Sequence, residues 1–239
     1  LPAAVAGVDV VYHAAAQVGD WGPWREFEAV TIEGTRNVLE AAAQAGVPRF
    51  LHVSTDGVYA FRYLGKRMTE ETPLETRFAW WDYYRRSKLA AERLVWQRHD
   101  EGRLAVTAVR PGVVLGERDR ATLPGVVAFL RSKSAAYMGS GRNRLPCVYA
   151  GDVAAGCVLA ATNEGAAGQA YNLVSHETVT QRDLFAAIAE ESGLTPPKRA
   201  MPLPLTYGVG FAMELASVLT GRRSRPSLTR FAVTLIGAD

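Results

Sequence analysis

The sequence predicts an α/β fold built on a parallel sheet, and two observations lead to that class. First, three short apolar runs with strand character alternate with two longer helical stretches between residues 8 and 110. Second, the apolar runs are almost continuous, as expected where helices cover both faces of a parallel sheet. The 239 residues, of which 48% are hydrophobic, are enough to bury a sizeable core.

The elements of the first half follow at the spacing of right-handed parallel crossovers. The predicted order is strand 8–16, helix 25–45, strand 49–54, helix 83–99 and strand 104–110. Gly46-Val47-Pro48 is a good stop for the first helix, and Pro111-Gly112 ends the third strand.

Beyond Gly112 the pattern becomes less regular. We expect short strands over 146–150 and 169–174, and helices over 152–161, 181–192, 205–219 and 228–236. Thr180 precedes Asp183 by three residues, which is the spacing of a helix N-cap with a carboxylate at its third position. The second half therefore reads as a smaller, irregular lobe attached to the sheet.

The composition excludes several classes of function. The net charge is only +3 and no basic run is interleaved with aromatic residues, so we expect no nucleic-acid partner. Two cysteines and four scattered histidines predict neither a disulfide framework nor a metal site. We find no signal peptide and no apolar run of membrane-spanning length, and so expect a reduced cytoplasmic protein. The mildly basic balance is compatible with an acidic ligand such as a phosphorylated cofactor.

Residues with acid–base chemistry follow the second strand. Ser54-Thr55 lies at that strand's carboxyl end, the edge where open α/β sheets bind ligands. Tyr84 and Lys88 are four residues apart at the start of a helix, so both side chains can lie on one face. A nearby cation favours the phenolate form of a tyrosine, whose ordinary pKa is about 10. Tyr-x-x-x-Lys alone is a weak signal, but its order with Ser54-Thr55 and Arg110-Pro111-Gly112 is much rarer.

Several motifs in chain order resemble the extended short-chain dehydrogenase/reductase superfamily, the group named NAD-dependent epimerase/dehydratase. The motifs are Asp9-Val10-Val11-Tyr12-His13-Ala14-Ala15, Gly34-Thr35-Arg36-Asn37-Val38-Leu39-Glu40-Ala41, Val53-Ser54-Thr55-Asp56-Gly57-Val58-Tyr59, Tyr84-x-x-x-Lys88, Arg110-Pro111-Gly112, Val148-Tyr149-Ala150-Gly151-Asp152-Val153-Ala154 and Tyr171-Asn172-Leu173. The resemblance covers nearly the whole chain.

The resemblance implies a site for NAD or NADP and hydride transfer at a secondary alcohol or ketone carbon. Tyr84 would be the catalytic acid–base group, and Lys88 would lower its pKa and hold the nicotinamide ribose. Thr55 would hydrogen-bond the reacting oxygen. Besides Tyr84 and Lys88, the residues implied to line the cofactor are Ala14, Ala15, Val53, Ser54, Pro111, Gly112, Val113 and Val114.

The implied fold is a Rossmann-type, doubly wound parallel sheet with a smaller mixed C-terminal substrate lobe. Residues 1–115 would form the partial dinucleotide-binding and catalytic core. Residues 116–239 would form mainly the substrate lobe, with some elements returning to the core. Family members often dimerise through the helix with Tyr-x-x-x-Lys and its neighbour, which suggests a homodimer by analogy.

Two departures from the family pattern matter. Thr31 stands where the family usually has an asparagine of a hydrogen-bond relay. The glycine-rich loop that binds the cofactor's pyrophosphate is missing, and Gly139-Ser140-Gly141 does not replace it because it lacks a third glycine and a preceding long strand. We therefore expect a first βαβ unit of roughly 60 residues to precede this sequence, and weak NAD(P) binding by this polypeptide alone. The sequence does not show whether the cofactor is NAD or NADP, because the segment that distinguishes the two belongs to that unit.

The loop after the second strand and a later segment narrow the class of reaction that we expect. Asp56-Gly57 lacks the second carboxylate of the family's dehydratases, which disfavours dehydration. Residues 143–149 are more apolar than in nucleotide-sugar epimerases and resemble the branch of 3β-hydroxysteroid dehydrogenases and dihydroflavonol reductases. The leading hypothesis is thus an oxidoreductase for a bulky apolar substrate, steroid-like or flavonoid-like. A nucleotide-sugar epimerase and a non-catalytic NAD(P) sensor are the alternatives.

Candidate substrate contacts come from the loops that flank these groups. Asp56 and Asn143 are two of them. Trp21, Trp24 and Trp81, with Trp80 beside them, would line an apolar substrate pocket, or would instead pack at the interface of the two lobes.

Overall fold

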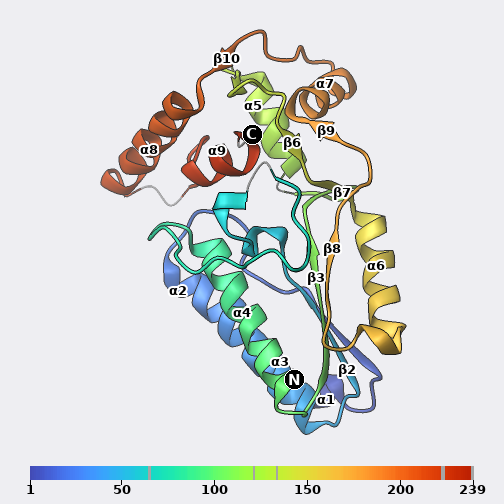
Figure 1. The fold of residues 1–239 in the computed structure, drawn as a ribbon. Helices are drawn as coiled ribbons and strands as arrows, with labels where there is room; N and C mark the ends of the chain where they lie inside the picture. The colour runs from blue at the N-terminus through green and yellow to red at the C-terminus, as the bar shows by residue number, and fades with distance from the viewer. Residues whose placement is uncertain (64–65, 121, 133, 222–223, 238–239) are drawn as a thin grey trace.

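The computed structural model describes residues 1–63, 66–120, 122–132, 134–221 and 224–237. Its centre is a sheet of four parallel strands in the order β1 (Val10–His13), β2 (Arg49–Val53), β3 (Ala105–Pro111) and β8 (Ala170–Leu173) (Figure 1). The register pairs Val10 with Arg49 and Arg49 with Ala105, so the first three strands begin together, and β3 continues two residues beyond the end of β2. The predicted parallel α/β class is confirmed.

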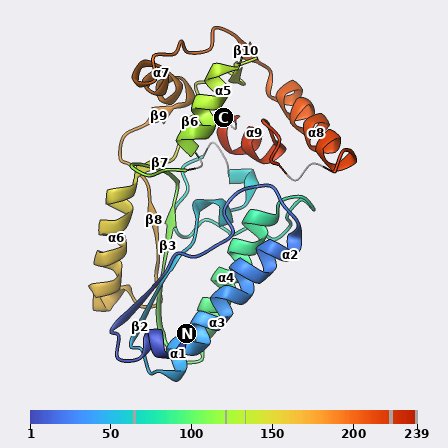
Figure 2. The same cartoon turned by 180° about the vertical axis from the view of Figure 1, so that it is seen from behind.

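Helices cover both faces of this sheet, as Figures 1 and 2 show. One face carries α2 (Trp24–Phe27), α3 (Gly34–Gln44) and α4 (Tyr83–Asp100), with the short α1 (Pro2–Val5) at the edge, and the other carries α6 (Ala150–Thr162). Phe50 and Val106 pack towards α3 and α4, whereas Leu51 and Val109 pack towards α6. This alternation explains why the strand sequences are apolar throughout.

A π-helical segment, Glu28–Glu33, joins α2 to α3. The sequence predicts a helical stretch over 25–45, and the structure divides that stretch into α2, this π-helical segment and α3. Thr31 lies in this segment, fully buried; its hydroxyl accepts a hydrogen bond from the Gln17 amide at 2.9 Å, and its carbonyl accepts one from the Thr35 hydroxyl at 2.6 Å. Such π turns are rare and often occur at functional sites.

The remaining elements form a second lobe beyond the carboxyl edge of the sheet (Figure 1). They are β4 (Val113–Leu115), α5 (Thr122–Arg131), β5 (Tyr137–Met138), β6 (Arg144–Leu145), β7 (Cys147–Tyr149), β9 (Val179–Thr180), α7 (Gln181–Glu191), β10 (Ala200–Met201), α8 (Leu203–Leu219) and α9 (Arg230–Gly237). Strands pair as β4–β7, β5–β10 and β6–β9. Phe185 of α7 packs with Val126 and Leu130 of α5 and with Tyr137, giving this lobe its own core.

Most predicted elements lie within two residues of the observed ones. The first strand is the exception, since only Val10–His13 of the predicted 8–16 is extended and paired. Thr180 and Asp183 form the expected capping box at α7. Short 3-10 turns at Asp56–Val58, Phe61–Tyr63 and Glu164–Ala166 complete the fold.

Two observations on the described residues concern membrane crossing and metal binding. Among the helices described, none combines the length and the apolar character needed to cross a bilayer. Within the same residues, no group of three or more His, Cys, Asp or Glu side chains could hold a metal ion.

Candidate active site

The candidate site lies where β2 ends. Thr55 follows Val53-Ser54, and its hydroxyl accepts a hydrogen bond from the Gly57 amide at 3.2 Å, which starts the 3-10 turn Asp56–Val58. Because β1, β2 and β3 are parallel and in register, the segments after all three strands meet at this edge. The sheet thus places Thr55 beside the residues that follow β1 and β3.

Helix α4 brings the other two predicted groups to the same place. Tyr84 lies in its first turn and hydrogen-bonds Thr55 through its phenol. Lys88, one turn later, is buried and donates from Nζ to the carbonyl of Val53 at 2.6 Å. The structure therefore gathers Thr55, Tyr84 and Lys88 around the last residues of β2.

Burial dominates the electrostatics of Tyr84. It raises the pKa of the Tyr84 phenol above its ordinary value, the hydrogen bond to Thr55 opposes that shift, and the charge of Asp56 adds to it. The Lys88 ammonium donates to the Val53 carbonyl, and its lowering of the Tyr84 pKa together with the nicotinamide ring stays a prediction. Burial also lowers the pKa of Lys88 to about 8, against the opposing charge of Glu92.

Asp56 is a second acid–base group in this site. Burial raises its pKa to about 6, and hydrogen bonds from Thr55 and the Gly57 amide and the charge of Arg85 only partly offset that shift. The Thr55 hydroxyl lies 3.3 Å from Asp56 Oδ1. A chain of hydrogen bonds thus links the Tyr84 phenol, the Thr55 hydroxyl and the Asp56 carboxyl group.

Arg85 holds two segments of this site together, and sequence reasoning missed it. It is buried, and it pairs with buried Asp82 at 2.9 Å and donates to the carbonyls of Gly57 and Tyr59, the latter at 2.6 Å. These bonds tie the start of α4, which carries Tyr84, to the turn that carries Asp56. The position of Arg85 directly after Tyr84 does not predict this role, because consecutive residues of a helix point to different faces.

A buried polar chain lies behind the site, between α4 and the sheet. Ser54 donates to Glu92, which pairs with Arg110 at 2.5 Å; Arg110 donates to the Tyr59 hydroxyl at 2.9 Å, and that hydroxyl donates to Asn172 at 2.7 Å. The Ser54 side chain is therefore turned inward, and only its backbone is available to line a cofactor site.

Two histidines occupy the same interior layer. His13 and His52 stack side by side on β1 and β2, with ring centroids 5.8 Å apart. His13 Nε2 lies 2.9 Å from the Thr35 hydroxyl, and burial and the charge of Lys88 lower the pKa of His13 to about 4. Neither ring nitrogen of His52 has a hydrogen-bond partner among the described residues, and burial lowers its pKa well below 6.5.

The predicted substrate contacts are distributed differently. Trp24 packs on Tyr83, with centroids 5.6 Å apart, and Trp81 packs on Arg230. Asn143 is buried, with its amide hydrogen-bonded to Gln181 and to the Ile236 carbonyl, and its contact with substrate stays a prediction. Trp21 is half-buried in the loop after β1.

Phe231 of α9 lies on the Tyr84 ring, with centroids 6.0 Å apart in an edge-to-face arrangement. No sequence pattern pointed to Phe231, because its role depends on where α9 packs. The apolar cover of the site is therefore contributed by the C-terminal lobe.

Several residues could hold the nicotinamide end of NAD(P). Ala14 and Ala15 follow β1 and are exposed, so their small side chains leave the carboxyl edge open to a flat ring. Pro111 at the end of β3 is buried, whereas in β4 Val113 is half-buried and Val114 is exposed. A Cβ on Gly112 would lie 1.9 Å from the Pro146 carbonyl oxygen, so Gly112 serves close packing of the two lobes. The residues present fit that end of the cofactor.

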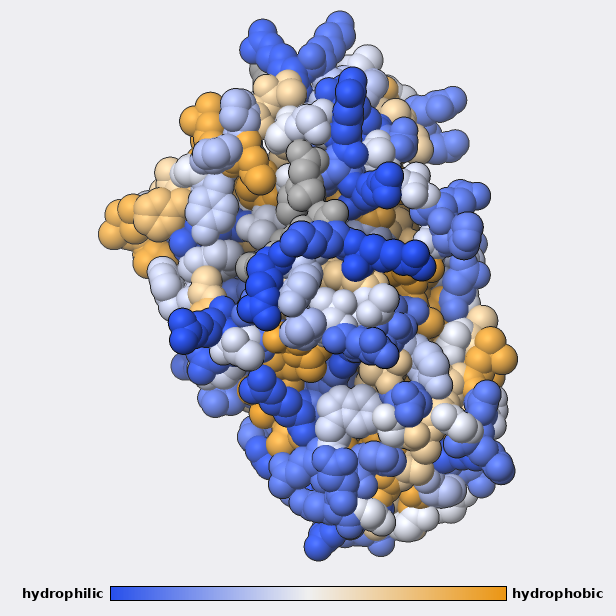
Figure 3. Space-filling view, viewed as in Figure 1, coloured by the Kyte–Doolittle hydropathy of each residue, from blue (hydrophilic) through white to orange (hydrophobic). Residues whose placement is uncertain are grey.

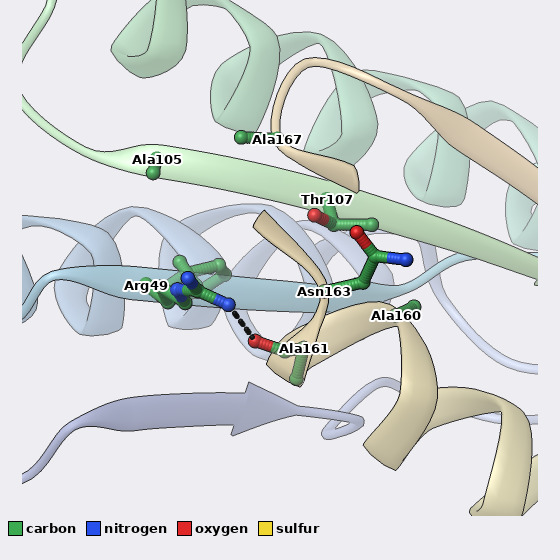
Figure 4. A pocket seen from close by; sticks show the side chains of 8 residues that line it. Arg49, Ala105, Thr107, Ala160, Ala161, Asn163 and Ala167 are labelled. Atoms are coloured by element: carbon green, nitrogen blue, oxygen red, sulfur yellow. Dashed lines mark hydrogen bonds between the residues drawn. The ribbon is translucent and has the colours of Figure 1, made fainter. Parts of the chain in front are cut away.

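A small cavity elsewhere is not part of this site. Figure 4 shows it between the beginnings of β2 and β3 and the end of α6, at the opposite edge of the sheet. Its volume is about 20 Å³, which holds little more than one water, and the Arg49 guanidinium spans it to the Ala161 carbonyl at 2.8 Å.

Comparisons with known proteins agree with this geometry. The chain is 28% identical to the 2-alkyl-3-oxoalkanoate reductase of Shewanella oneidensis, over 95% of this chain and 61% of that protein. It is 32% identical to the 4-hydroxy-2-methyl-3-oxo-4-farnesyl-3,4-dihydroquinoline-1-oxide ketoreductase of Stigmatella aurantiaca, over 98% of this chain and 69% of that protein. The chain thus spans about two thirds of the length of these relatives.

A solved structure extends the likeness to the fold and the cofactor. A short-chain dehydrogenase/reductase superfamily protein from Agrobacterium tumefaciens, with bound NAD, superposes with a TM-score of 0.71 at 26% identity, over 84% of this chain and 70% of that one. The family model described as the NAD dependent epimerase/dehydratase family matches residues 2–173, which include the whole sheet and the residues Thr55, Tyr84 and Lys88. By sequence and by fold, this chain belongs to the NAD dependent epimerase/dehydratase family, whose members bind NAD(P).

Proposed function

We propose that this chain carries the catalytic part of an NAD(P)-dependent oxidoreductase that acts on a secondary alcohol or ketone. The observation that carries the proposal is the hydrogen bond between Thr55 and Tyr84 at the carboxyl edge of the sheet, with Lys88 one turn further along α4. A protein that only sensed NAD(P) would need none of these three side chains.

The roles follow from where the three groups lie. The hydroxyls of Thr55 and Tyr84 together bind and orient the reacting oxygen, and Tyr84 exchanges a proton with it. Lys88, held by the Val53 carbonyl, would hold the nicotinamide ribose, and Ala14, Ala15 and the backbone of 111–114 would line the ring. When bound, the cofactor supplies or accepts the hydride.

The raised pKa of Tyr84 is compatible with ketone reduction. Its phenol carries its proton at neutral pH and can donate it to a carbonyl oxygen that is becoming an alkoxide. In alcohol oxidation the same group accepts the proton, and the net direction follows from the concentrations of cofactor and substrate.

The substrate we propose is a bulky, mainly apolar ketone, in line with the 3β-hydroxysteroid dehydrogenase and dihydroflavonol reductase branch. Phe231 packs on Tyr84 from the second lobe, and Trp81 packs close by on Arg230 of the same helix α9. The names of both reported relatives describe a 3-oxo group on a molecule with hydrocarbon substituents. An aromatic cover beside the proton donor suits such a molecule.

We also propose that residues 1–115 form the partial cofactor-binding and catalytic core and that 116–239 form mainly the substrate lobe. The packing of α6 against the sheet and the pairing of β8 with β3 support the return of some later elements to the core. A homodimer through α3 and α4 remains part of this proposal, and light scattering after gel filtration tests it.

A panel assay tests the function. The natural protein is mixed with NADH or NADPH and a ketosteroid, a flavanonol, a 2-alkyl-3-oxoalkanoate or a nucleotide sugar, and cofactor oxidation is followed at its absorbance. We expect net oxidation with at least one apolar ketone. Interconversion of the nucleotide sugar without net oxidation would replace the proposal by an epimerase, and cofactor binding without any conversion would replace it by a sensor.

A further inference from the structure

Tyr84 must exchange protons with solvent between turnovers. In ketone reduction the phenol gives its proton to the reacting oxygen and has to regain one before the next molecule reacts. In alcohol oxidation it has to release the proton that it took up. Two sides of the site lie next to the phenol, namely the interior of the sheet and the turn after β2.

In the part of the chain that the structure describes, side chains on the interior side form no continuous path to the phenol. Lys88 donates from Nζ to the Val53 carbonyl, and a carbonyl has no proton to pass on. The charge of Lys88 reaches His13 and His52, but neither ring nitrogen of His52 has a hydrogen-bond partner among the described residues. Burial lowers the pKa of both imidazoles, to about 4 in His13, so both rings stay neutral at neutral pH. A path through side chains in this direction stops at Lys88.

The turn after β2 provides a continuous path. The Thr55 hydroxyl is hydrogen-bonded to the Tyr84 phenol and lies 3.3 Å from Oδ1 of Asp56. A hydroxyl has one proton and two acceptor lone pairs, and the Gly57 amide donates to one of these lone pairs. The proton and the second lone pair remain for Tyr84 and Asp56. Thr55 can therefore donate to either neighbour while it accepts from the other, and turning the hydroxyl exchanges the two roles.

The carboxyl group at the end of this path is suited to exchange with solvent. Asp56 is half-buried, whereas Thr55 is buried, so the path leads from the interior to a residue that solvent reaches. Burial raises the pKa of the Asp56 carboxyl group to about 6. A group with a pKa near neutral pH both takes up and releases protons readily.

The groups that face this carboxyl group come from α4. Arg85 is the cation that interacts with Asp56, and its charge favours the ionised carboxylate. Arg85 also interacts with Asp82 and Glu75, so its charge is shared among three acidic side chains. Tyr84 is the other titratable group, and the charge of Asp56 raises the pKa of its phenol. The phenol and the carboxyl group are thus coupled by charge as well as by hydrogen bonds.

We propose that Asp56 exchanges protons with Tyr84 through the Thr55 hydroxyl and so connects the proton donor to solvent. In reduction the phenol passes its proton to the reacting oxygen, Thr55 passes its proton to the phenolate, and Asp56 passes its proton to Thr55. The carboxylate then takes up a proton from solvent, so the net change is one proton moved from solvent to product. In oxidation the same steps run in reverse. This relay rests on the proposed function, and it gives Asp56 a role other than substrate contact.

Steady-state kinetics of Asp56→Asn tests the relay. The natural protein and the variant receive reduced cofactor and a ketone accepted in the panel, and kcat and KM are measured over about two pH units on either side of 6. We expect kcat of Asp56→Asn at pH 6 to be lower by roughly tenfold with little change in KM, because an amide does not take up and release the proton. In the unchanged protein kcat should fall as the pH rises through about 6, and the variant should lack this dependence. The pKa values of His13 and Lys88, about 4 and about 8, lie to either side of that step.

Rescue by an external acid distinguishes the relay from a loss of structure. Imidazole added to Asp56→Asn should raise kcat in proportion to its concentration, because it supplies the proton that the carboxyl group no longer supplies. Asp100→Asn is the matched control, since Asp100 is exposed at the far end of α4. This variant should keep the kcat and the pH dependence of the unchanged protein and should not respond to imidazole. An unchanged kcat in Asp56→Asn would overturn the relay, and a raised KM with an unchanged pH dependence of kcat would make Asp56 a substrate contact instead.

A titration without substrate separates the relay from the proposed reaction. Ionisation of the Tyr84 phenol is followed by its ultraviolet absorbance, as the difference between each protein and its Tyr84→Phe counterpart. We expect the pKa of this phenol to be lower in Asp56→Asn than in the unchanged protein, because a nearby negative charge has been removed. The same pKa in both proteins would overturn the link between the two groups even if ketones are reduced. A lowered pKa in a protein that reduces no ketone would support the link and overturn the proposed function alone.

Discussion

The two long helices α4 and α8 place opposite kinds of side chain in the interior. Helix α4 buries Arg85, Lys88 and Glu92, and each has a specific partner, namely Asp82, the Val53 carbonyl and Arg110. Helix α8 buries one charge, Glu214, and exposes most of its apolar side chains. The same chain thus uses one helix to order polar groups inside and another to present apolar groups outside.

The difference follows from what each arrangement costs. A buried charge is tolerated only where its partner is fixed, so the polar side of α4 is held in one geometry. That rigidity is what a proton-transfer site needs, because misplaced groups lose most of their effect. An exposed apolar face is unfavourable in water and becomes favourable only when a partner covers it. Helix α4 therefore suits chemistry, whereas the outward face of α8, where hydrophobic residues gather on the surface (Figure 3), would be stabilised by contact with any apolar surface that covers it.

The largest expected effect comes from removing the phenol on α4. Tyr84→Phe should lower the reductase rate about 10²- to 10⁴-fold, because it removes the phenol that donates the proton to the reacting oxygen. The melting temperature should change little, and cofactor binding should be retained. Tyr83→Phe is the matched control, since Tyr83 precedes Tyr84 and packs on Trp24 instead. Equal losses in the two variants would contradict the assignment.

Removing the carboxylate of Glu92 tests the buried polar chain. Glu92→Ala leaves Arg110 buried without its partner and also removes acceptors for Ser54 and Trp96. We expect a loss of about 3–5 kcal/mol in the free energy of unfolding, measured by urea denaturation. Glu101→Ala, which removes an exposed partner of Arg98 at the end of the same helix, should change stability little. A small loss in the free energy of unfolding of Glu92→Ala would mean that the buried polar chain of side chains does not hold α4 in place.

The carboxyl group of Asp56 should make stability depend on pH. Its folded-state pKa of about 6 lies above the ordinary 3.8, so it contributes stability that is fully present below pH 3.8 and is lost as the pH rises through about 6. Asp56→Asn should therefore melt at a higher temperature than the unchanged protein above pH 6, and the difference should vanish towards pH 4. Asp9→Asn, at an exposed position, serves as control. A constant difference across this range would contradict the raised pKa.

The smallest effect is expected at His52, whose ring makes no hydrogen bond among the described residues. Its folded-state pKa lies well below 6.5, so below that pH the unfolded chain takes up a proton that the native one does not. The native state therefore loses stability as the pH falls below 6.5, by at most about 1.4 kcal/mol per pH unit. His52→Leu should remove this loss. Exposed His176→Leu should leave the slope of melting temperature against pH unchanged. An unchanged slope in His52→Leu would place a partner on that ring.

Much of this fold could be predicted from local patterns. Strand β3 and helices α4 and α7 lie where apolar runs, stop signals and the Thr180–Asp183 cap predicted them. Helix α5 was not predicted, because Pro124-Gly125 is typical of a turn, although a proline is tolerated in the first turn of a helix. The spacing of Tyr84 and Lys88 predicted that both can lie on one helix face, and the resemblance to the family implied that they share a site with Thr55.

The rest of the site depends on contacts between distant segments. Three features of the site follow only from the packed structure. They are the direction of the Lys88 ammonium, the bonds of Arg85 to the turn after Thr55 and the position of Phe231 on Tyr84. The same is true of α8, whose apolar character was visible in the sequence. Its buried Glu214 and outward leucines were not, because they depend on the ion pair with Arg230.

The proposed chemistry is tested most directly by following the hydride and the proton donor together. The natural protein is given a ketone accepted in the panel and reduced cofactor carrying deuterium at the transferred position, and the product is examined by mass spectrometry. We predict an alcohol with one deuterium on the carbinol carbon, formed by the unchanged protein and by Tyr83→Phe but not, on the same timescale, by Tyr84→Phe. Deuterated product formed at an unchanged rate by Tyr84→Phe, or product without deuterium, would contradict the proposed mechanism.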